Sequence, residues 1–407
     1  MRTFLVRLTI FLSIIVLSLP AQQAQQDKVV LAKAQKLAQQ YIIIDTHIDV
    51  PYRLKMKFED ISKLTPDGNF DYVRAKQGGL NAPFMSIYIP AEYEKTGGGK
   101  QLADTLIDMV VKFSKDWPKQ FAVAKSVQDV TTQFKRGVVS LCMGIENGTP
   151  IEHDLKNVQY FYDRGIRYIT LAHALSNHIS DSSYDTTHVW RGLSFFGRRL
   201  VAEMNRVGIM VDVSHITDDA FYEVMNVTKT PVIASHSSCR FFTPGFERNM
   251  SDDMIKLLAK NGGVIQINFG SSFLREDYQK LENEQGKEVM TYFKEHHLKF
   301  GDPDAETYLK QYRKDHPVTF ADVTDVANHI DHVVKLVGVD YVGVGSDFDG
   351  VGDSLPTGLK DVSMYPNLIY ELLKRGYVDK DIQKICGGNL LRVWSEVEQR
   401  AKELQAK

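Results

Sequence analysis

Cysteine is scarce in this sequence, which has only Cys142, Cys239 and Cys386 among its 407 residues. The three lie far apart, and an odd number of cysteines cannot be fully paired, so a disulfide framework does not hold the fold together. Their spacing also matches no cysteine-based zinc pattern. If the protein binds a metal ion, histidine and carboxylate side chains must supply the ligands.

Charge imbalance is also absent, since 49 Lys and Arg residues and 51 Asp and Glu residues give a net charge of −2. No basic run occurs, so nothing favours binding to nucleic acid or to an acidic membrane surface. The sequence has no internal repeat, low-complexity tract or Pro-rich linker. We therefore expect one globular domain over residues 28–407, with a small molecule as its partner.

Long hydrophobic runs are absent except near the start, where an apolar stretch from Leu8 to Leu19 follows Arg2 and Arg7. This order, with small and polar residues around Ala21, predicts a secretory signal peptide over residues 1–21. An uncleaved membrane anchor is the alternative, but the apolar run is short for a bilayer span. We expect export across the inner membrane to the periplasm or the cell exterior, with no integral membrane span after cleavage.

Short runs rich in β-branched residues recur eight times along the rest of the chain, and nearly all of them end in a polar residue. Segments with helical spacing lie between most of these runs, and Ser251 can cap one of the helices. This alternation favours an α/β fold of the (β/α)₈ TIM-like barrel type over a doubly wound sheet. The runs end at Asp45, Ile89, Glu146, His173, His215, His236, Phe269 and Asp347.

The segment from Leu274 to Pro317 interrupts this alternation, because it contains charged, helix-favouring residues and no strand-like run. A structureless loop of this length is uncommon inside a compact domain. We therefore expect a helical insertion between the seventh and eighth strands, which would form a solvated cover near the mouth of the barrel.

Polar residues stand at the carboxyl ends of most of the predicted strands. In a barrel of this type the chemistry lies at that end, so the side chains would face one cavity. The run IIIDTHIDV, over residues 42–50, is typical of the pattern, because alternate strand residues point to the same side. The complete set is His47, Asp49, Glu146, His173, His215, His236 and Asp347.

Imidazoles and carboxylates without thiolates suit Zn²⁺ or a similar divalent ion. A carboxylate between two ions would hold them about 3.5–4 Å apart. Glu146 is the best bridge, because it stands alone on a strand that reads as buried, where an unpaired charge is costly. Two alternatives stay open: each histidine singly can be a core histidine bonded to a backbone carbonyl, and Glu146 can belong to a buried salt bridge.

The motifs resemble those of the membrane (renal) dipeptidase family, the M19 peptidases, within the wider amidohydrolase-like barrels. The resemblance spans nearly all of the chain after the signal segment, and the order of the motifs agrees with it. It implies a TIM-like barrel of the metal-dependent hydrolase type. It rests on DTHIDVP, GGLNAPFMSIYIP, GIENG, YITLAH, GLSFFGRRLVAEMNRVGIMVDVSH, PVIASHSSCR, ERNMSDDMIKLLAKNGGVIQINF, VGVGSDFDGV and GGNLLRV.

The resemblance implies a secreted zinc-dependent dipeptidase, which hydrolyses the amide bond of dipeptides with a metal-bridging hydroxide. It implies two Zn²⁺ ions bridged by Glu146. His47 and Asp49 would complete the ligand set of one ion, and His215 and His236 that of the other.

The resemblance also implies roles for residues at the substrate. His173 would polarise or hold the scissile carbonyl, and Asp347 would accept the proton of the bridging water and pass it to the leaving amine. Arg248 would hold the substrate carboxylate, with a surface arginine as the alternative. Tyr88 would contact the substrate, with a packed barrel tyrosine as the alternative. A D-residue at the C-terminal position of the substrate would be tolerated.

The sequence departs from the family pattern beside the predicted site. Thr46 and Ile48 stand where the family commonly has Gly and Asn, and LNAPFM replaces a commoner Gly-Gln-Phe-Trp. These changes flank the metal strand and the substrate wall, so they put the side-chain preference in doubt.

Two other functions and the oligomeric state stay open. One function is another binuclear-metal amidohydrolase with an amide or lactone substrate, although no Lys stands at the fourth strand end to bridge the metals. The other is a non-catalytic periplasmic binding protein, which would be expected to lack a ligand or the proton-transfer acid. A homodimer is one alternative for the assembly.

Overall fold

The structure is a computed structural model that describes residues 26–299 and 302–406. The predicted signal peptide, residues 1–21, lies outside the described residues. Within the described ranges, no helix is long and apolar enough to cross a bilayer. A helix over residues 26–40 buries Ala34, Leu37 and Ala38 and leads into the first strand.

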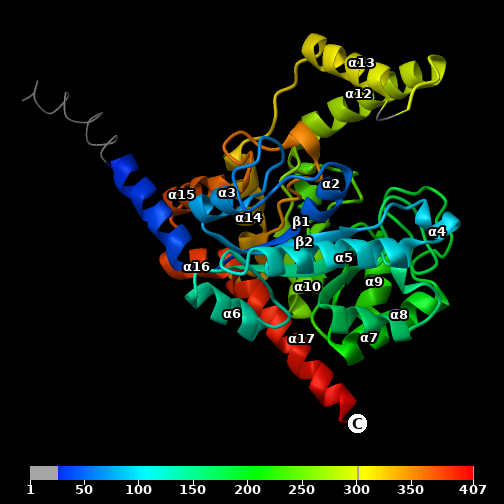
Figure 1. The fold of residues 1–407 in the computed structure, drawn as a ribbon, viewed down its shortest axis with the longest axis horizontal. Coiled ribbons are helices and arrows are strands. Elements are labelled where there is room, and N and C mark those ends of the chain that lie inside the picture. Colours follow the sequence, from blue (N-terminus) through cyan, green and yellow to red (C-terminus); the bar gives the residue numbers. More distant parts are fainter. Residues whose placement is uncertain (1–25, 300–301, 407) are drawn as a thin grey trace, which may run out of the picture.

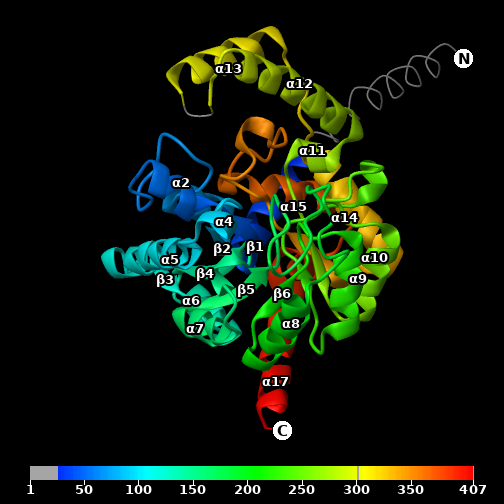
Figure 2. The same cartoon turned by 90° about the vertical axis from the view of Figure 1, so that its right-hand side faces the viewer.

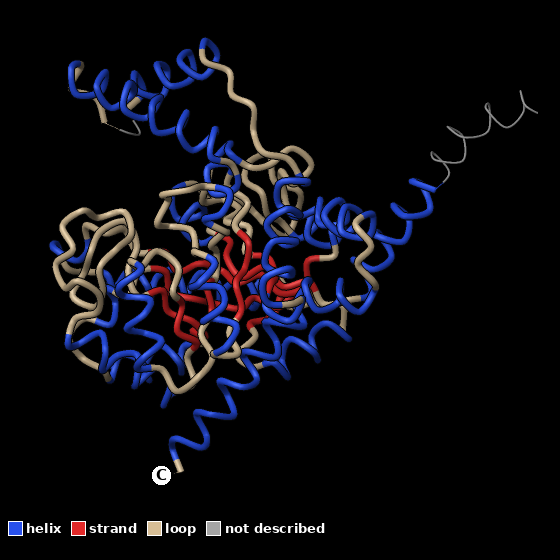
Figure 3. The backbone as a smooth tube through the Cα atoms, turned by 180° about the vertical axis from the view of Figure 1, so that it is seen from behind, coloured by secondary structure: helices blue, strands red, loops and turns tan. Residues whose placement is uncertain are grey.

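Parallel strands form the centre of the molecule, and helices surround them (Figure 3). Eight of the strands pair in the order in which they occur along the chain, which confirms the predicted (β/α)₈ barrel. Their bounds are β1 (Ile43–Ile48), β2 (Leu80–Tyr88), β4 (Val139–Glu146), β5 (Ile166–Thr170), β6 (Met210–Asp212), β7 (Ile233–Ala234), β8 (Val264–Ile267) and β9 (Val342–Val344).

The segment that follows the last strand meets the end of the first strand and nearly closes the barrel. Ile48 and Phe348 form a parallel bridge, and the amide of Asp49 donates a hydrogen bond of 2.9 Å to the carbonyl of Phe348. Because all eight strands run in the same direction, their carboxyl ends surround one opening.

The sequence analysis missed one strand, β3 (Phe121–Val123), which pairs with β4 outside the barrel. It also placed several strand ends wrongly. Four strands were predicted to reach His173, His215, His236 and Asp347, but the observed ladders end at Thr170, Asp212, Ala234 and Val344. His215 and Asp347 have φ angles of +71° and +64°, which a strand cannot contain, so the chain leaves the sheet before these residues.

Inward-facing side chains fill the barrel interior near the amino ends of the strands. Ile44, Phe84 and Tyr168 from three strands belong to one buried cluster with Trp394 of the C-terminal helix α17 (Asn389–Gln405). The rings of Phe84 and Trp394 lie 5.6 Å apart. The amino end of the barrel is therefore closed by packing, and only the carboxyl end is available for a site.

Helices cover the outside of the barrel, and several start at residues that suit a helix start. Ser126, Ser194, Thr217 and the predicted cap Ser251 each accept a hydrogen bond from a backbone amide of the first turn. Apart from α17 and the helices of the insertion, the helices after β1 are α2 (Val50–Met56), α3 (Tyr72–Gly78), α4 (Tyr93–Thr96), α5 (Gly99–Asp116), α6 (Val127–Lys135), α7 (Lys156–Arg164), α8 (Phe195–Val207), α9 (Asp218–Val227), α10 (Asp252–Lys260), α11 (Ser271–Leu274), α14 (Val323–Val337), α15 (Tyr365–Lys374) and α16 (Asp379–Gln383).

The predicted helical insertion between the seventh and eighth barrel strands is confirmed. It contains α12 (Glu276–Glu295) and α13 (Pro303–Asp315), which lie side by side and project from the barrel on the side opposite to the end of α17 (Figures 1 and 2). We call this pair the arm. The arm has a small core of its own, made of Val289, Phe293, Ala305 and Tyr312.

Candidate active site

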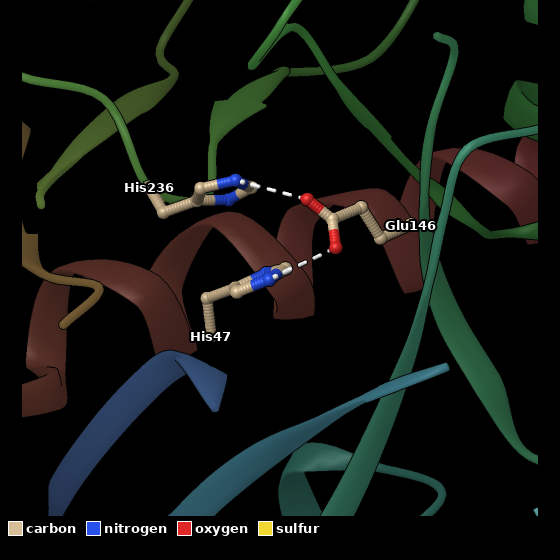
Figure 4. A group of neighbouring side chains, drawn as sticks. All are labelled: His47, Glu146 and His236. Carbon is tan, nitrogen blue, oxygen red and sulfur yellow. Dashed lines mark ion pairs between the residues drawn. The ribbon is translucent and has the colours of Figure 1, made fainter. Parts of the chain in front are cut away.

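Glu146, the last residue of β4, lies at the centre of the site (Figure 4). Its Oε2 is 3.4 Å from His47 Nε2. Its Oε1 faces the other side, 3.1 Å from His215 Nε2 and 3.3 Å from His236 Nε2. One carboxylate therefore has one oxygen directed at each of two groups of histidines, which is the arrangement that a bridging ligand needs.

The remaining predicted ligand lies on the side of His47. Asp49 Oδ2 is 3.4 Å from His47 Nε2; His47 lies in β1, and Asp49 directly follows that strand. On the other side, the Nε2 atoms of His215 and His236 lie 2.8 Å apart. The structure thus brings all five predicted metal ligands together.

The grouping of potential ligand atoms differs in detail from the predicted sets. Among the described residues, three overlapping groups of three side chains have potential ligand atoms that lie within 4.8 Å of one another. They show that His236 also lies close to His47, that His173 lies close to His215, and that Asp347 lies close to Asp49. The triads are His47–Glu146–His236, Glu146–His173–His215 and His47–Asp49–Asp347.

The electrostatics of the site keep most of its imidazoles neutral. Burial, with the nearby Arg248 cation, holds the pKa of His215 well below its usual range. Burial, with His47 and Arg248, does the same for the pKa of His236. Burial opposes ionisation of Glu146, but His47 and His173 outweigh it and hold the pKa of Glu146 well below its usual range. Neutral imidazoles beside an ionised carboxylate have the free electron pairs that a metal ion requires.

His47 differs from the other histidines. Burial alone would lower its pKa, but Tyr168, Glu146 and Asp49 outweigh burial and raise the pKa well above the usual range. Its Nε2 is buried and has no hydrogen-bond partner among the described residues. A cation held between Glu146 and Asp49 would satisfy this atom, so the residues fit a divalent metal ion.

A second layer of residues orients the ligands. The hydroxyl of Tyr168 lies 2.9 Å from His47 Nδ1, and the hydroxyl of Ser235 lies 2.7 Å from His236 Nδ1. Ser235 also donates to Asp212 Oδ2 at 2.6 Å. Contacts of this kind fix the ring orientation of metal-binding histidines. The sequence analysis missed these residues, and the position of Tyr168 on the inner face of its strand was the only available signal.

Asp347 stands at the entrance to the metal ligands. Burial, with the negative charges of Asp49 and Glu146, raises its pKa to about 7. Its Oδ2 accepts a hydrogen bond of 2.7 Å from the side-chain amide of Asn268. A carboxyl that titrates near neutral pH can both accept and return a proton. Asn268, which follows β8, was also missed by the sequence analysis.

The opening of the barrel contains a cavity of about 600 Å³, which is large enough for a small molecule. His173 and Tyr88 both line it, and their rings meet edge to face with centroids 4.9 Å apart. Three of the predicted metal ligands and Asp347 also line the cavity, namely Asp49, Glu146 and His215. Among the cavity-lining residues that the sequence analysis missed are Tyr52, Tyr184 and Phe273.

Arg248 lies behind the cavity wall and is buried. Its guanidinium donates to the hydroxyl of Ser237 at 2.7 Å and to the carbonyl of His236 at 2.9 Å. The same group lies 5.2 Å from the ring centre of Phe273, which lines the cavity. Its Nε has no hydrogen-bond partner among the described residues. The structure thus excludes a surface arginine and leaves a buried donor free.

Comparison with known proteins agrees with this site. Residues 31–407 match the family model described as membrane dipeptidase (peptidase family M19). An uncharacterised dipeptidase of Schizosaccharomyces pombe is 31% identical over 384 residues, which cover 90% of this chain and 82% of that protein.

Solved structures share the fold. The probable dipeptidase PvdM from Pseudomonas aeruginosa is 27% identical with a TM-score of 0.79, over 92% of this chain and 99% of that chain. A metallo peptidase from Rhodobacter sphaeroides, liganded with a phosphinate mimic of the dipeptide L-Ala-D-Ala, is 24% identical with a TM-score of 0.72, over 88% and 99% of the two chains. The chain therefore belongs to the membrane dipeptidase family, peptidase family M19, and is a metallo-dipeptidase of that family.

Proposed function

We propose that this protein is a secreted dipeptidase that uses two Zn²⁺ ions bridged by Glu146. The proposal rests on the orientation of the Glu146 carboxylate. One of its oxygens faces His47, and the other faces His215 and His236. Two zinc ions would make a water molecule acidic enough to lose a proton at neutral pH, so that it can attack an amide. They would also supply Lewis-acid stabilisation of the carbonyl oxygen.

The side chains around the metal position would perform the remaining steps. His173, at the cavity wall, would hold the scissile carbonyl. Asp347 would take the proton from the attacking water and deliver it to the leaving amine, and Asn268 would keep its carboxyl in position. Arg248 would attract the free carboxylate of the substrate, because its buried charge has no ion-pair partner among the described residues.

The test is metal analysis of the purified protein paired with a screen of dipeptide hydrolysis. We expect about two divalent ions per chain, and we expect the His215→Ala variant to lose at least one ion and most activity, since loss of supporting contacts alone costs roughly 10–100-fold. A metal content near zero after supplementation with zinc would refute the proposal. Activity on amides or lactones but not on dipeptides would favour another amidohydrolase.

Export and assembly are separate parts of the proposal. The apolar stretch from Leu8 to Leu19 supports cleavage after residue 21 and release outside the cytoplasm. Sequencing of the mature amino terminus after cell fractionation tests this directly. Light scattering on the same material distinguishes a homodimer from a monomer.

A further inference from the structure

The arm adds a negatively charged group to the cavity. Glu282 of α12 lines the metal cavity, and it also lines a neighbouring cavity of about 560 Å³ between the arm and the barrel. Glu282 is an exposed residue overall, but partial burial raises the pKa of its carboxyl group, and a hydrogen bond with Ser272 opposes this effect. Glu282 therefore stands where the two cavities meet.

The other carboxylates of the metal cavity already have a proposed role or a partner. Asp49 and Glu146 are proposed metal ligands, and Asp347, which lies near Asp49, is the proposed proton-transfer group. Asp349 pairs with Arg53 at 2.9 Å and accepts a hydrogen bond from the amide of Asn69.

Glu282, in contrast, has no Lys, Arg or His within ion-pair distance in the described part of the chain. It is the cavity carboxylate whose charge the protein leaves unpaired.

We propose that Glu282 binds a positively charged side chain of the substrate, so that the enzyme favours dipeptides containing Lys or Arg. This inference rests on the proposed dipeptidase function. The α-amino group of a dipeptide lies two bonds from the scissile carbonyl, so it must stay near the metal ligands. Glu282 comes from the arm and also lines the neighbouring cavity, so we expect a long side chain, rather than the α-amino group, to reach it.

The wall that leads to Glu282 suits the stem of such a side chain. Phe273 and Val351 line the metal cavity, and Val351 continues into the neighbouring cavity together with Ser354. Lys and Arg have apolar stems and a charged end, so their methylene groups can lie along apolar surface while the charge meets a carboxylate. The arrangement therefore matches a basic side chain better than an apolar one of the same length.

The experiment compares lysine with norleucine, which has the same carbon chain without the charge. Hydrolysis of Ala-Lys and Ala-norleucine tests the C-terminal position, and hydrolysis of Lys-Ala and norleucine-Ala tests the N-terminal position. At one of the positions we expect the wild-type kcat/KM for the lysine peptide to exceed that for the norleucine peptide by about 5-fold, the size of a partly exposed ion pair. In Glu282→Gln this ratio should fall to about 1.

The matched control is Glu284→Gln, which removes an exposed carboxylate from the same helix but from neither cavity. It should keep the wild-type ratio. Binding of phosphinate dipeptide mimics with lysine and norleucine side chains, measured by calorimetry, gives the same comparison without turnover.

The outcomes separate this inference from the proposed function. Equal rates on lysine and norleucine peptides, a preference for norleucine, or a lysine preference that survives in Glu282→Gln would overturn the role of Glu282 and leave the dipeptidase intact. Failure of the zinc-loaded wild type to hydrolyse any of the four peptides, with no binding of the mimics, would overturn the proposed function instead.

Discussion

The backbone amide of Asp347 donates a hydrogen bond of 3.0 Å to the carbonyl oxygen of His47. This contact joins the segment after the last strand to the end of the first strand. The same contact therefore helps to close the barrel and places the proposed proton-transfer group beside a proposed metal ligand. Asp347 has a φ of +64°, which turns its side chain out of the strand direction. The side chain of Asp347 then comes within 4.8 Å of ligand atoms of both His47 and Asp49.

The first prediction tests Asp347 as the proton acceptor. Asp347→Asn keeps the size of the side chain but cannot take a proton, so kcat should fall by about 10²–10⁴-fold while KM changes much less. Metal content should stay near the wild-type value, because Asp347 is not among the proposed ligands. Wild-type turnover by this variant would remove Asp347 from the mechanism.

The second prediction concerns the pH dependence of stability in the metal-free protein. The pKa of Asp347 is raised from 3.8 to about 7 in the folded state. The folded protein therefore holds this proton more tightly than the unfolded chain, and the contribution of Asp347 to the free energy of unfolding is lost as the pH rises from about 4 to about 7.

Asn cannot titrate, so the Asp347→Asn variant does not lose this contribution. The free energy of unfolding of the variant minus that of the wild type should therefore increase by roughly 2–4 kcal/mol between pH 4 and pH 8. Urea denaturation of both proteins in the presence of a chelator measures the difference. Parallel stability curves would show that Asp347 titrates at its ordinary pKa.

The third prediction concerns Gly350, which follows Asp347 in the same loop. A Cβ at Gly350 would lie 2.4 Å from Asp347 Oδ1 and 2.4 Å from Asp49 Oδ2, so Gly350→Ala must displace both carboxylates. We expect kcat/KM to fall on the order of 100-fold, because small displacements of reacting groups have large effects, and we expect metal binding to weaken.

The control for Gly350 is Gly286→Ala on the arm, where a Cβ would meet nothing within 4 Å. This change should keep activity and stabilise the helix by about 0.5–1 kcal/mol. Kinetics, metal titration and thermal melting of the two variants provide the comparison. Normal kinetics in Gly350→Ala would show that the loop can move without cost.

Much of the fold was predictable from the sequence, because it depends on regular alternation. Strand-like runs and helical segments repeat along the chain, and the insertion from Leu274 to Pro317 is visible as the place where they stop. The carboxyl ends of parallel strands share one opening, so the clustering of His47, Glu146 and His236 followed from their positions at strand ends.

Other features could not be predicted, because they depend on local backbone shape or on long-range contacts. The positive φ of His215 shortens a predicted strand, and nothing in a pattern of period two indicates it. The contact between Tyr168 and His47 joins residues 121 positions apart. Arg248 came from family resemblance alone, and its burial behind Phe273 is visible only in three dimensions.

The last prediction concerns substrate length and depends on Arg248. A guanidinium that is fixed beyond the metal position can pair with the free carboxylate of a dipeptide, whereas an amide or a longer peptide places a neutral group there. Pairing of this kind is worth roughly 10–100-fold in affinity, since hydrogen bonds to charged groups contribute about 1.5–3 kcal/mol.

We therefore expect the wild-type enzyme to hydrolyse a free dipeptide at least about 10-fold faster, in kcat/KM, than the C-terminally amidated dipeptide or a tripeptide. Arg248→Ala should lose this discrimination, mainly through slower hydrolysis of the free dipeptide. Because Arg248 also donates to Ser237 and to the carbonyl of His236, metal content and thermal melting of the variant must be measured beside its kinetics. The comparison of acid and amide in the wild type is independent of any effect of mutation on folding. Equal rates on the two would show that Arg248 does not read the substrate carboxylate, and its buried charge would then serve to keep His215 and His236 neutral.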